Sequence, residues 1–175
     1  MKNIDPKWWV LIAIGTGTLM SSLDGSVVNI ILPVLRETFN SDVSTVEWVV
    51  TVYLVVLSGL LLTFGRLGDL RGHKTVYMWG FSIFILSSII CGAAWSPVVL
   101  IVFRGIQAIG GAMLSSNSPA IITGNVPAEE RGRAFGLVST MTYLGLTIGP
   151  SLGGWLAHTV GWRAVFYINV PIGLT

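Results

Sequence analysis

Charged residues are scarce in this sequence. Lys, Arg, Asp and Glu together make up only 10% of the 175 residues, and the mean hydropathy is +0.77. A soluble domain is about one quarter charged, so this chain lacks the polar surface that water requires. The net charge of +2 is small, and it argues against nucleic acid as a partner. Lipid is therefore the expected solvent for most of the chain.

Cysteine and catalytic groups are also few. Cys91 is the single cysteine and lies in an apolar run, which excludes an internal disulfide. His73 and His158 stand far apart in the sequence. The sequence has no nucleophile beside a base, no phosphate-binding glycine loop after a strand and no metal-ligand cluster. We therefore expect neither an enzyme nor a bound cofactor or metal.

Long apolar runs are abundant. A helix needs about 20 residues to cross a bilayer, and five runs of roughly that length follow one another before a shorter sixth. We predict an all-α, polytopic membrane protein in which residues 1–175 form one N-terminal transmembrane bundle. The predicted spans are about 8–35, 46–64, 76–94, 98–122, 134–158 and 164–175, the last of them incomplete.

The basic residues predict how these spans are oriented. Seven of the ten lie in the N-terminus, in the connection after span two and in the connection after span four: Lys2, Lys7, Arg66, Arg71, Lys74, Arg131 and Arg133. The opposite side has only Arg36 and Arg163. Positively charged connections stay on the cytoplasmic side. We therefore place the N-terminus in the cytoplasm.

Asp24 and Arg104 are the two charged residues that lie well inside the predicted spans, away from their ends. Trp9 marks the membrane surface at one end of span one, and Pro97 marks the opposite surface at the start of span four. At about 1.5 Å of rise per residue, Asp24 lies about 22 Å from the first surface and Arg104 about 10 Å from the second. In a hydrocarbon core about 30 Å thick, the two side chains reach a similar depth. An ion pair between them is therefore possible, although depth alone does not make the two helices neighbours.

Two interpretations of this pair stay open. A charge inside the membrane is costly and must be paired or face water, so the pair could simply hold helices together. Alternatively, Asp24 could exchange a proton or contact a substrate while Arg104 tunes it, with burial and the guanidinium acting in opposite directions. Asn29 and Gln107, in the same spans, could line a cavity or bond another helix.

Glycines and charges mark two further segments. Residues 65–74 hold four charged residues and three glycines between apolar runs, and we expect a tight loop at the membrane surface. Span five contains Gly145, Gly149 and Gly153 at spacings of four, which places them on one face for close helix packing. Pro150 and Gly154 lie among them, and we expect the proline to kink the helix.

Together these segments resemble the major facilitator superfamily, and within it the fourteen-span drug:proton antiporter branch. The motifs occur in the order expected for that branch: Leu23–Pro33 in span one, Gly65–Lys74 after span two, Leu100, Arg104, Gln107, Gly110 and Ala112 in span four, Gly145, Gly149, Pro150, Gly153 and Gly154 in span five, and Gly161–Arg163 with Phe166, Asn169 and Pro171 at the start of span six. His73 departs from the pattern, because arginine is usual there.

The resemblance implies an exporter of the plasma membrane that works by alternating access. The superfamily has two six-span bundles, and this chain would supply only the first, with a C-terminal bundle as its partner. A small amphipathic or cationic substrate would bind between the bundles, and protons would drive its exit. Asp24 would be the proton or substrate site and Arg104 its partner.

The resemblance also gives residues 65–74 a role as a cytoplasmic latch. Gly65 and Gly72 would permit a tight turn, and Asp69 would dock near the positively polarised N-terminus of a helix in the second bundle. Arg71 would join that network, together with Glu129, Glu130, Arg131 or Arg133. Without that role, the segment would be only a positively charged turn.

Other functions remain as alternatives. The chain could belong to a symporter or a uniporter of the same superfamily, although the motif of span five favours an antiporter. It could also be a non-transporting membrane subunit, because the sequence is too short for a pathway between two bundles. The sequence does not give the substrate.

Overall fold

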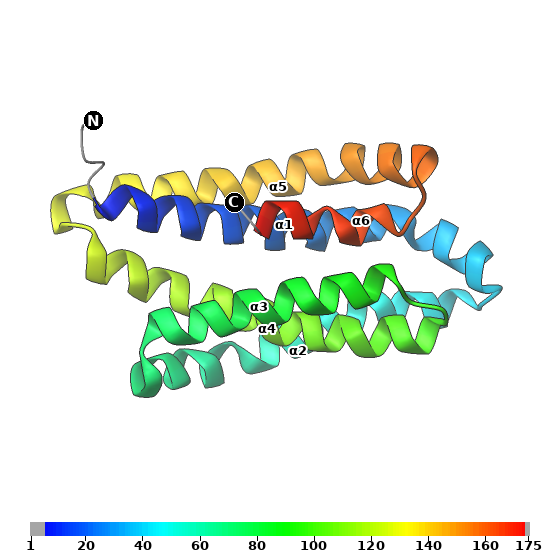
Figure 1. Cartoon of the computed structure of the whole chain (residues 1–175), viewed down its shortest axis with the longest axis horizontal. Coiled ribbons are helices and arrows are strands. Elements are labelled where there is room, and N and C mark those ends of the chain that lie inside the picture. The colour runs from blue at the N-terminus through cyan, green and yellow to red at the C-terminus, as the bar shows by residue number, and fades with distance from the viewer. Residues whose placement is uncertain (1–5, 174–175) are drawn as a thin grey trace.

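The computed structural model describes residues 6–173, which form one bundle of helices (Figure 1). The elements are α1 (Pro6–Phe39), α2 (Val43–Arg71), α3 (His73–Gly92), α4 (Pro97–Asn125), a single 3-10 turn η1 (Ala128–Glu130), α5 (Arg131–Thr159), α6 (Ala164–Tyr167) and α7 (Asn169–Gly173). The prediction of an all-α bundle is confirmed. Lys2 and the last two residues of the sixth predicted span lie outside the described residues.

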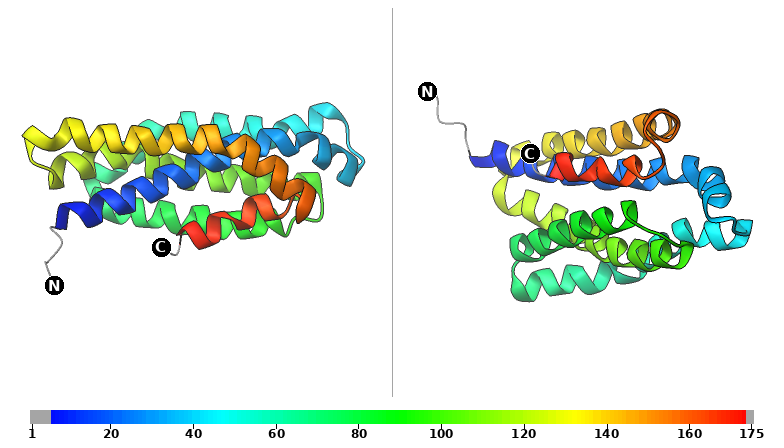
Figure 2. Two further views of the ribbon diagram at one scale, coloured as in Figure 1. Left: turned by 90° about the horizontal axis from the view of Figure 1, so that it is seen from above. Right: turned by 45° about the vertical axis from the view of Figure 1, so that its right-hand side comes forward.

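The helices run roughly parallel to the long axis and turn back at the two ends of the bundle (Figure 1). The start of α1, the α2–α3 turn and the α4–α5 turn lie at one end, as the distribution of basic residues predicted. The α1–α2, α3–α4 and α5–α6 turns lie at the other end. Figure 2 shows the same alternation from two further directions.

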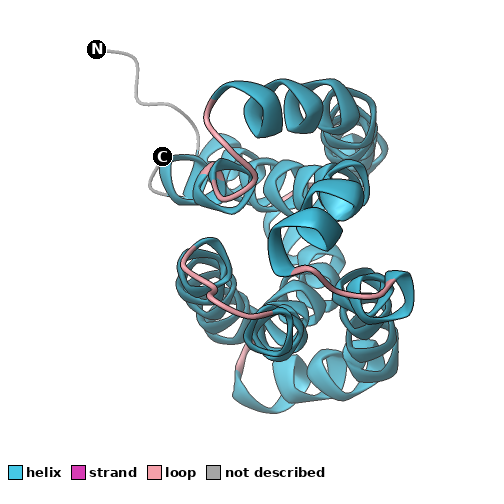
Figure 3. Ribbon diagram, turned by 90° about the vertical axis from the view of Figure 1, so that its right-hand side faces the viewer, coloured by secondary structure: helices cyan, strands magenta, loops and turns pink. Residues whose placement is uncertain are grey.

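Two groups of helices make up the bundle (Figure 3). Helix α5 packs along α1, and α4 packs along both α2 and α3. The short helices α6 and α7 join the groups, since they contact α1 and α3. By length and composition, α1 to α4 can each cross a membrane. Helix α5 has 29 residues, but its many glycine, serine and threonine residues keep it outside that set of apolar helices.

The turns follow from local sequence. Ser96 caps α4 by accepting a hydrogen bond from the backbone N–H of Val99 at 3.3 Å, and Pro97 occupies the first turn, where a missing N–H costs nothing. Gly72 separates α2 from α3 with φ of +88°, and Gly161 separates α5 from α6 with φ of +107°. Both angles favour glycine because it has no Cβ.

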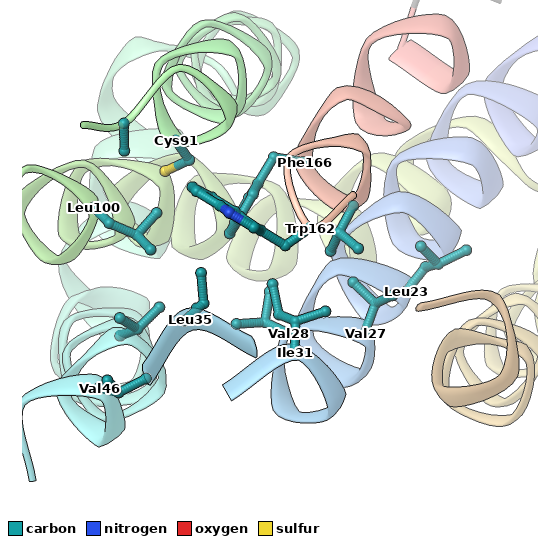
Figure 4. Close-up of a cluster of buried hydrophobic side chains, with 13 residues drawn as sticks. Leu23, Val27, Val28, Ile31, Leu35, Val46, Cys91, Leu100, Trp162 and Phe166 are labelled. Atoms are coloured by element: carbon teal, nitrogen blue, oxygen red, sulfur yellow. The ribbon is translucent and has the colours of Figure 1, made fainter. Parts of the chain in front are cut away.

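Two apolar clusters fill the interior. One lies towards the end of the bundle that carries the α3–α4 turn, and it contains Leu23, Val28, Leu100, Trp162 and Phe166 with their neighbours (Figure 4). The other contains Ile14, Met20, Phe84 and Ile122 towards the opposite end. Many large apolar side chains point outwards instead, as expected of a surface that meets lipid: Leu54, Val55, Leu62, Leu86, Leu146 and Trp155.

Candidate functional site

The buried centre of the bundle holds an ion pair between α1 and α4. Arg104 Nη1 donates to Asp24 Oδ2 at 2.5 Å, and both side chains are fully buried. Asp24 follows Met20 and precedes Val28, so the pair lies between the two apolar clusters. Removing two charges from water costs several kcal/mol per ion, and close hydrogen bonds must offset that cost.

The carboxylate of Asp24 receives two further hydrogen bonds. Its Oδ1 accepts from Gln107 Nε2 at 3.1 Å and from Asn169 Nδ2 at 2.8 Å. Gln107 lies one helical turn after Arg104 on α4, whereas Asn169 comes from α7. Three donors and a guanidinium charge form the surroundings that suit a charged carboxylate.

Arg104 is held on its other sides by α2 and α4. Its Nε donates to the carbonyl oxygen of Val49 at 3.2 Å, and Nη1 also donates to Gln107 Oε1 at 2.8 Å. The Cζ atom lies 4.1 Å from the centre of the Tyr53 ring. A desolvated cation over an aromatic ring gains about 2 kcal/mol, so Tyr53 offsets part of the cost of burying this charge.

Ser88 of α3 completes the arrangement. Its Oγ accepts from Gln107 Nε2 at 3.2 Å and from Asn169 Nδ2 at 2.8 Å, and it donates to the carbonyl oxygen of Phe166 at 2.9 Å. We call Asp24, Ser88, Arg104, Gln107 and Asn169 the buried polar cluster. Its members come from α1, α3, α4 and α7.

Sequence reasoning located part of this cluster. The matched depths of Asp24 and Arg104 allowed an ion pair, and the structure forms it. Gln107 joins the pair, while Asn29 does not: its side chain is exposed and donates to the carbonyl oxygen of Gly25 in its own helix, at 3.1 Å. Neither Gln107 nor Asp24 lines an open cavity, because both are fully buried.

Three partners were missed as members of the site. Ser88 and Tyr53 lie in apolar runs where serine and tyrosine are common, and Asn169 had been noted only as part of a motif. Asn169 did carry a signal, because it is an amide among apolar residues of the sixth predicted span. That span breaks at Ile168, between α6 and α7, and Asn169 is the first residue after the break.

The prediction of a loop over residues 65–74 is wrong. Helix α2 continues through Gly65 and Asp69 to Arg71, α3 begins at His73, and only Gly72 lies outside a helix. Gly65 lies inside α2 and makes no turn, and a Cβ added there would meet nothing closer than 4.0 Å. The charged residues did not distinguish the two structures, because charge is as common at the polar end of a helix as in a loop.

The charged groups near this turn pair locally. Asp69 lies 3.5 Å from Arg66 Nη1 and 3.5 Å from His73 Nε2, one helical turn away on either side. Glu130 pairs with Lys7 of α1 at 2.9 Å, so it joins the α4–α5 turn to the start of the chain. The latch role of Asp69 and Arg71 is a prediction that this arrangement leaves open.

The glycine face of α5 packs directly on α1. Ser26 Oγ donates to the carbonyl oxygen of Gly145 at 3.1 Å. A Cβ added at Gly145 would lie 2.9 Å from the backbone nitrogen of Leu23. At Gly149 the added Cβ would collide with Ser26 Oγ, and at Gly153 it would lie 3.1 Å from the carbonyl oxygen of Val27. Pro150 is exposed, and a Cβ on Gly154 would make only ordinary contact. The close contact therefore spans the stretch of α1 that carries Asp24.

A hollow of about 280 Å³ lies on another side of α1, towards α4 and α5. Its polar lining consists of hydroxyl groups: Thr18, Ser21, Ser22, Ser115, Ser118 and Thr142. Leu114, Ile122, Phe135 and Val138 contribute apolar walls. Several of the hydroxyl groups donate to their own helix backbone, as Ser118 does to the carbonyl oxygen of Leu114 at 2.7 Å.

Known proteins resemble the chain over nearly its whole length. The model of the family described as the Major Facilitator Superfamily matches residues 14–175. The chain is 39% identical over 168 residues to the riboflavin transporter RibZ of Clostridioides difficile (strain 630), and the match covers 96% of this chain and 37% of that protein. It is 38% identical over 165 residues to the methylenomycin A resistance protein of Bacillus subtilis (strain 168), with coverages of 94% and 35%.

Two further comparisons agree. The chain is 39% identical over 164 residues to the multidrug resistance protein Stp of Mycobacterium tuberculosis (strain ATCC 25618 / H37Rv), covering 93% of this chain and 30% of that protein. A solved structure of a bacterial homologue of the human lysosomal transporter Spinster, inward-facing and occupied, gives a TM-score of 0.83 at 20% identity, over 98% of this chain and 44% of that one. The chain thus spans 30% to 37% of the length of these curated relatives.

The sequence match, the helical architecture and the helices of membrane-spanning length agree with one another. They indicate a multi-pass membrane protein of a transporter family, rather than an enzyme. The chain belongs to the major facilitator superfamily.

Proposed function

We propose that this chain is the N-terminal bundle of a proton-coupled exporter of small molecules, in the fourteen-span drug:proton antiporter branch. Two of the relatives described above carry names of drug or antibiotic resistance proteins, and a third is named a riboflavin transporter. The second bundle, the substrate and the proton are parts of this proposal. The plasma membrane is the proposed location, with the N-terminus in the cytoplasm.

The observation that supports proton coupling most strongly is the buried pair of Asp24 and Arg104. When a proton neutralises Asp24, the guanidinium loses its partner inside the bundle. An uncompensated buried charge costs about 3–5 kcal/mol, which is enough to change the balance between two arrangements of the helices. Release of the proton restores the pair and the original arrangement.

Helix α5 is the element that would move with this change. Its glycine face touches α1 at Leu23, Ser26 and Val27, on both sides of Asp24 in the sequence. Glycine contacts let two helices slide without side chains that must first withdraw. The antiporter motif would therefore convert the charge state of Asp24 into a shift of α5 against α1.

The substrate would occupy the hydroxyl-lined hollow beside α1 rather than contact Asp24. The carboxylate is fully buried, whereas Ser22, Ser115 and Thr142 face the hollow. Proton and substrate would then use different sites on α1, and the coupling between them would pass through the helix. Small amphipathic molecules fit a hollow with apolar walls and a few hydrogen-bonding groups.

The latch is the proposal for residues 65–74. Asp69 is half exposed and lies in the last turn of α2, from which a carboxylate could reach the N-terminus of a helix in a second bundle. Gly72 supplies the sharp turn that brings α3 back.

A symporter or uniporter is the second candidate. The riboflavin transporter among the relatives has a name that does not state a direction of transport. Direction is therefore what an assay must decide.

The test uses the full-length protein in proteoliposomes with an imposed pH gradient and ethidium or riboflavin as substrate. We expect substrate to move against the proton flow, and we expect Asp24→Asn to abolish this movement while Glu37→Gln, an exposed acid on the same helix, preserves it. Movement of substrate together with protons would contradict antiport, and undiminished transport by Asp24→Asn would remove Asp24 from the mechanism.

A further inference from the structure

The side-chain amide of Asn169 has an unusual hydrogen-bonding state. It is fully buried, and its Nδ2 uses both hydrogens, one towards Asp24 Oδ1 at 2.8 Å and one towards Ser88 Oγ at 2.8 Å. Its Oδ1 has no hydrogen-bond partner among the described residues. A buried carbonyl oxygen without a partner costs about 1–3 kcal/mol, so this cost calls for an explanation.

The surroundings of Asp24 raise a related problem. Its neighbours Arg104, Gln107 and Asn169 all present donors to the carboxylate. A protonated carboxyl group must itself donate one hydrogen bond, yet in this arrangement none of these three atoms can accept it. The cluster in this form is built for the charged carboxylate, and protonation requires a neighbour to turn.

Asn169 is the neighbour that can turn. The alternative, Gln107, already has its Oε1 engaged by Arg104 Nη1 at 2.8 Å, so turning it would break the bond that holds the guanidinium. The acceptor of Asn169 is idle. Rotation about the terminal bond of an asparagine side chain meets only a broad, two-fold profile, so a half turn that exchanges Nδ2 and Oδ1 meets a low torsional barrier.

We infer that Asn169 senses the protonation of Asp24: its amide turns over when the carboxylate takes up a proton. The proton binds to Asp24 Oδ1, and the new O–H group donates to Asn169 Oδ1. This hydrogen bond takes the place of the one from Asn169 Nδ2 to Asp24 Oδ1. The turned amide also places Asn169 Oδ1 where Nδ2 had donated to Ser88 Oγ, so Ser88 turns its hydroxyl hydrogen from the carbonyl oxygen of Phe166 to Asn169 Oδ1 and keeps its bond from Gln107. When the proton leaves, the amide turns back. Asn169 is thus a positioning residue for the proposed proton site.

This arrangement gives α7 a part in proton coupling. Asn169 follows the break between α6 and α7 at Ile168, and Ser88 ties the same break to α3 through the carbonyl oxygen of Phe166. A turn of the amide changes which atoms link α7 to α1 and α3. The inference rests on the proposed role of Asp24, and the experiment below separates the two.

The test is acid-minus-alkaline infrared difference spectroscopy of the full-length protein in lipid films. Acidification of the wild type is expected to produce the C=O band of a carboxylic acid, and Asp24→Asn is expected to remove it. Asn169→Leu, similar in size but without polar atoms, is expected to shift this band to higher wavenumber, because the carboxyl hydrogen loses its acceptor.

Two variants serve as controls. Ser82→Ala changes an exposed serine of α3 whose hydroxyl donates to the carbonyl oxygen of Met78 at 3.0 Å, and it is expected to leave the band in place. Asn169→Ser carries a hydroxyl that can donate or accept, and is expected to bring the band back towards the wild-type position. If Asn169→Leu fails to reach the membrane, Asn169→Ala provides the same comparison.

The outcomes separate the two proposals. A band that depends on Asp24 but has the same position in Asn169→Leu and the wild type would overturn the role of Asn169 and leave proton binding at Asp24 intact. The absence of any band that depends on Asp24 would overturn the proposed proton site, and with it the present inference.

Discussion

The buried polar cluster and the segment 65–74 both carry charge, but in opposite ways. Asp24 and Arg104 are isolated in the sequence, fully buried and paired at 2.5 Å. Arg66 and Asp69 belong to the most charged stretch of the chain, yet their side chains are 73% and 52% exposed and lie 3.5 Å apart. The dense run of charges therefore lies at the exposed end of a helix, whereas the isolated charges form the buried candidate site.

The physical reason for this difference is desolvation. An exposed ion pair contributes about 0–1 kcal/mol, because water solvates the two charges almost as well when they are apart. A buried pair has lost its water, and removal of one partner costs about 3–5 kcal/mol. The predictions below test this contrast, from the largest expected effect to the smallest.

Loss of the arginine in the buried pair should have the largest effect. Arg104→Leu leaves the Asp24 carboxylate without its cation, and we expect the full-length protein to lose about 3–5 kcal/mol of stability. Thermal unfolding in detergent measures this loss. The double variant Asp24→Asn with Arg104→Leu should recover part of it, and equal instability of the single and double variants would contradict the pairing argument.

Overpacking of the α1–α5 contact comes next. A methyl group at Gly149 would collide with Ser26 Oγ, so Gly149→Ala should cost about 1–3 kcal/mol and reduce transport. Gly136 has nothing within 4 Å of an added Cβ. Gly136→Ala should therefore be neutral or should stabilise α5 by up to about 1 kcal/mol. Similar melting temperatures for the two variants would show that the glycine face is not tightly packed.

The helix end at residues 65–74 allows a smaller test. Gly72 has φ of +88°, so Gly72→Ala should cost about 1–2 kcal/mol. Gly65 is helical and has room for a methyl group, and Gly65→Ala should be stabilising by up to about 1 kcal/mol. Unfolding midpoints of both variants check the corrected position of the turn, and a destabilising Gly65→Ala would support the loop that the sequence suggested.

The exposed pair should matter least for stability. Arg66→Gln is expected to change the free energy of unfolding by less than about 1 kcal/mol. Asp69→Ala should be equally mild in stability but should slow transport, because the proposed latch acts on the balance between conformations. Substrate affinity measured by equilibrium binding separates the cases: affinity lost in proportion to transport would assign Asp69 to substrate binding.

The sequence predicted the fold from hydropathy and part of the candidate site from two charged residues inside apolar spans. Apolar runs predict helices well because a membrane allows few other structures. The depths of Asp24 and Arg104 could be computed from the helical rise, and Gln107 lay one turn further along the same helix. These inferences need only distances along a helix.

The remainder depends on how helices meet, which spacing does not determine. Asn29 was as plausible a cavity-lining residue as Gln107, but its side chain points away from the core. The rotation of α1 about its own axis decides this, and the sequence of one span does not reveal that rotation. Ser88 and Asn169 lie 81 residues apart, and only the packing of α7 between α1 and α3 brings them together. The extension of α2 through residues 65–71 was missed because glycine and charge are typical of loops and of helix ends alike.

Proton release on substrate binding tests the central claim most directly. The full-length protein, purified in weakly buffered detergent with a pH indicator, receives ethidium or riboflavin, whichever the wild type transports in proteoliposomes. We predict that the wild type releases protons on addition of that substrate, that Glu37→Gln releases as many, and that Asp24→Asn releases none while still folded. Equal proton release from the wild type and Asp24→Asn would contradict the account.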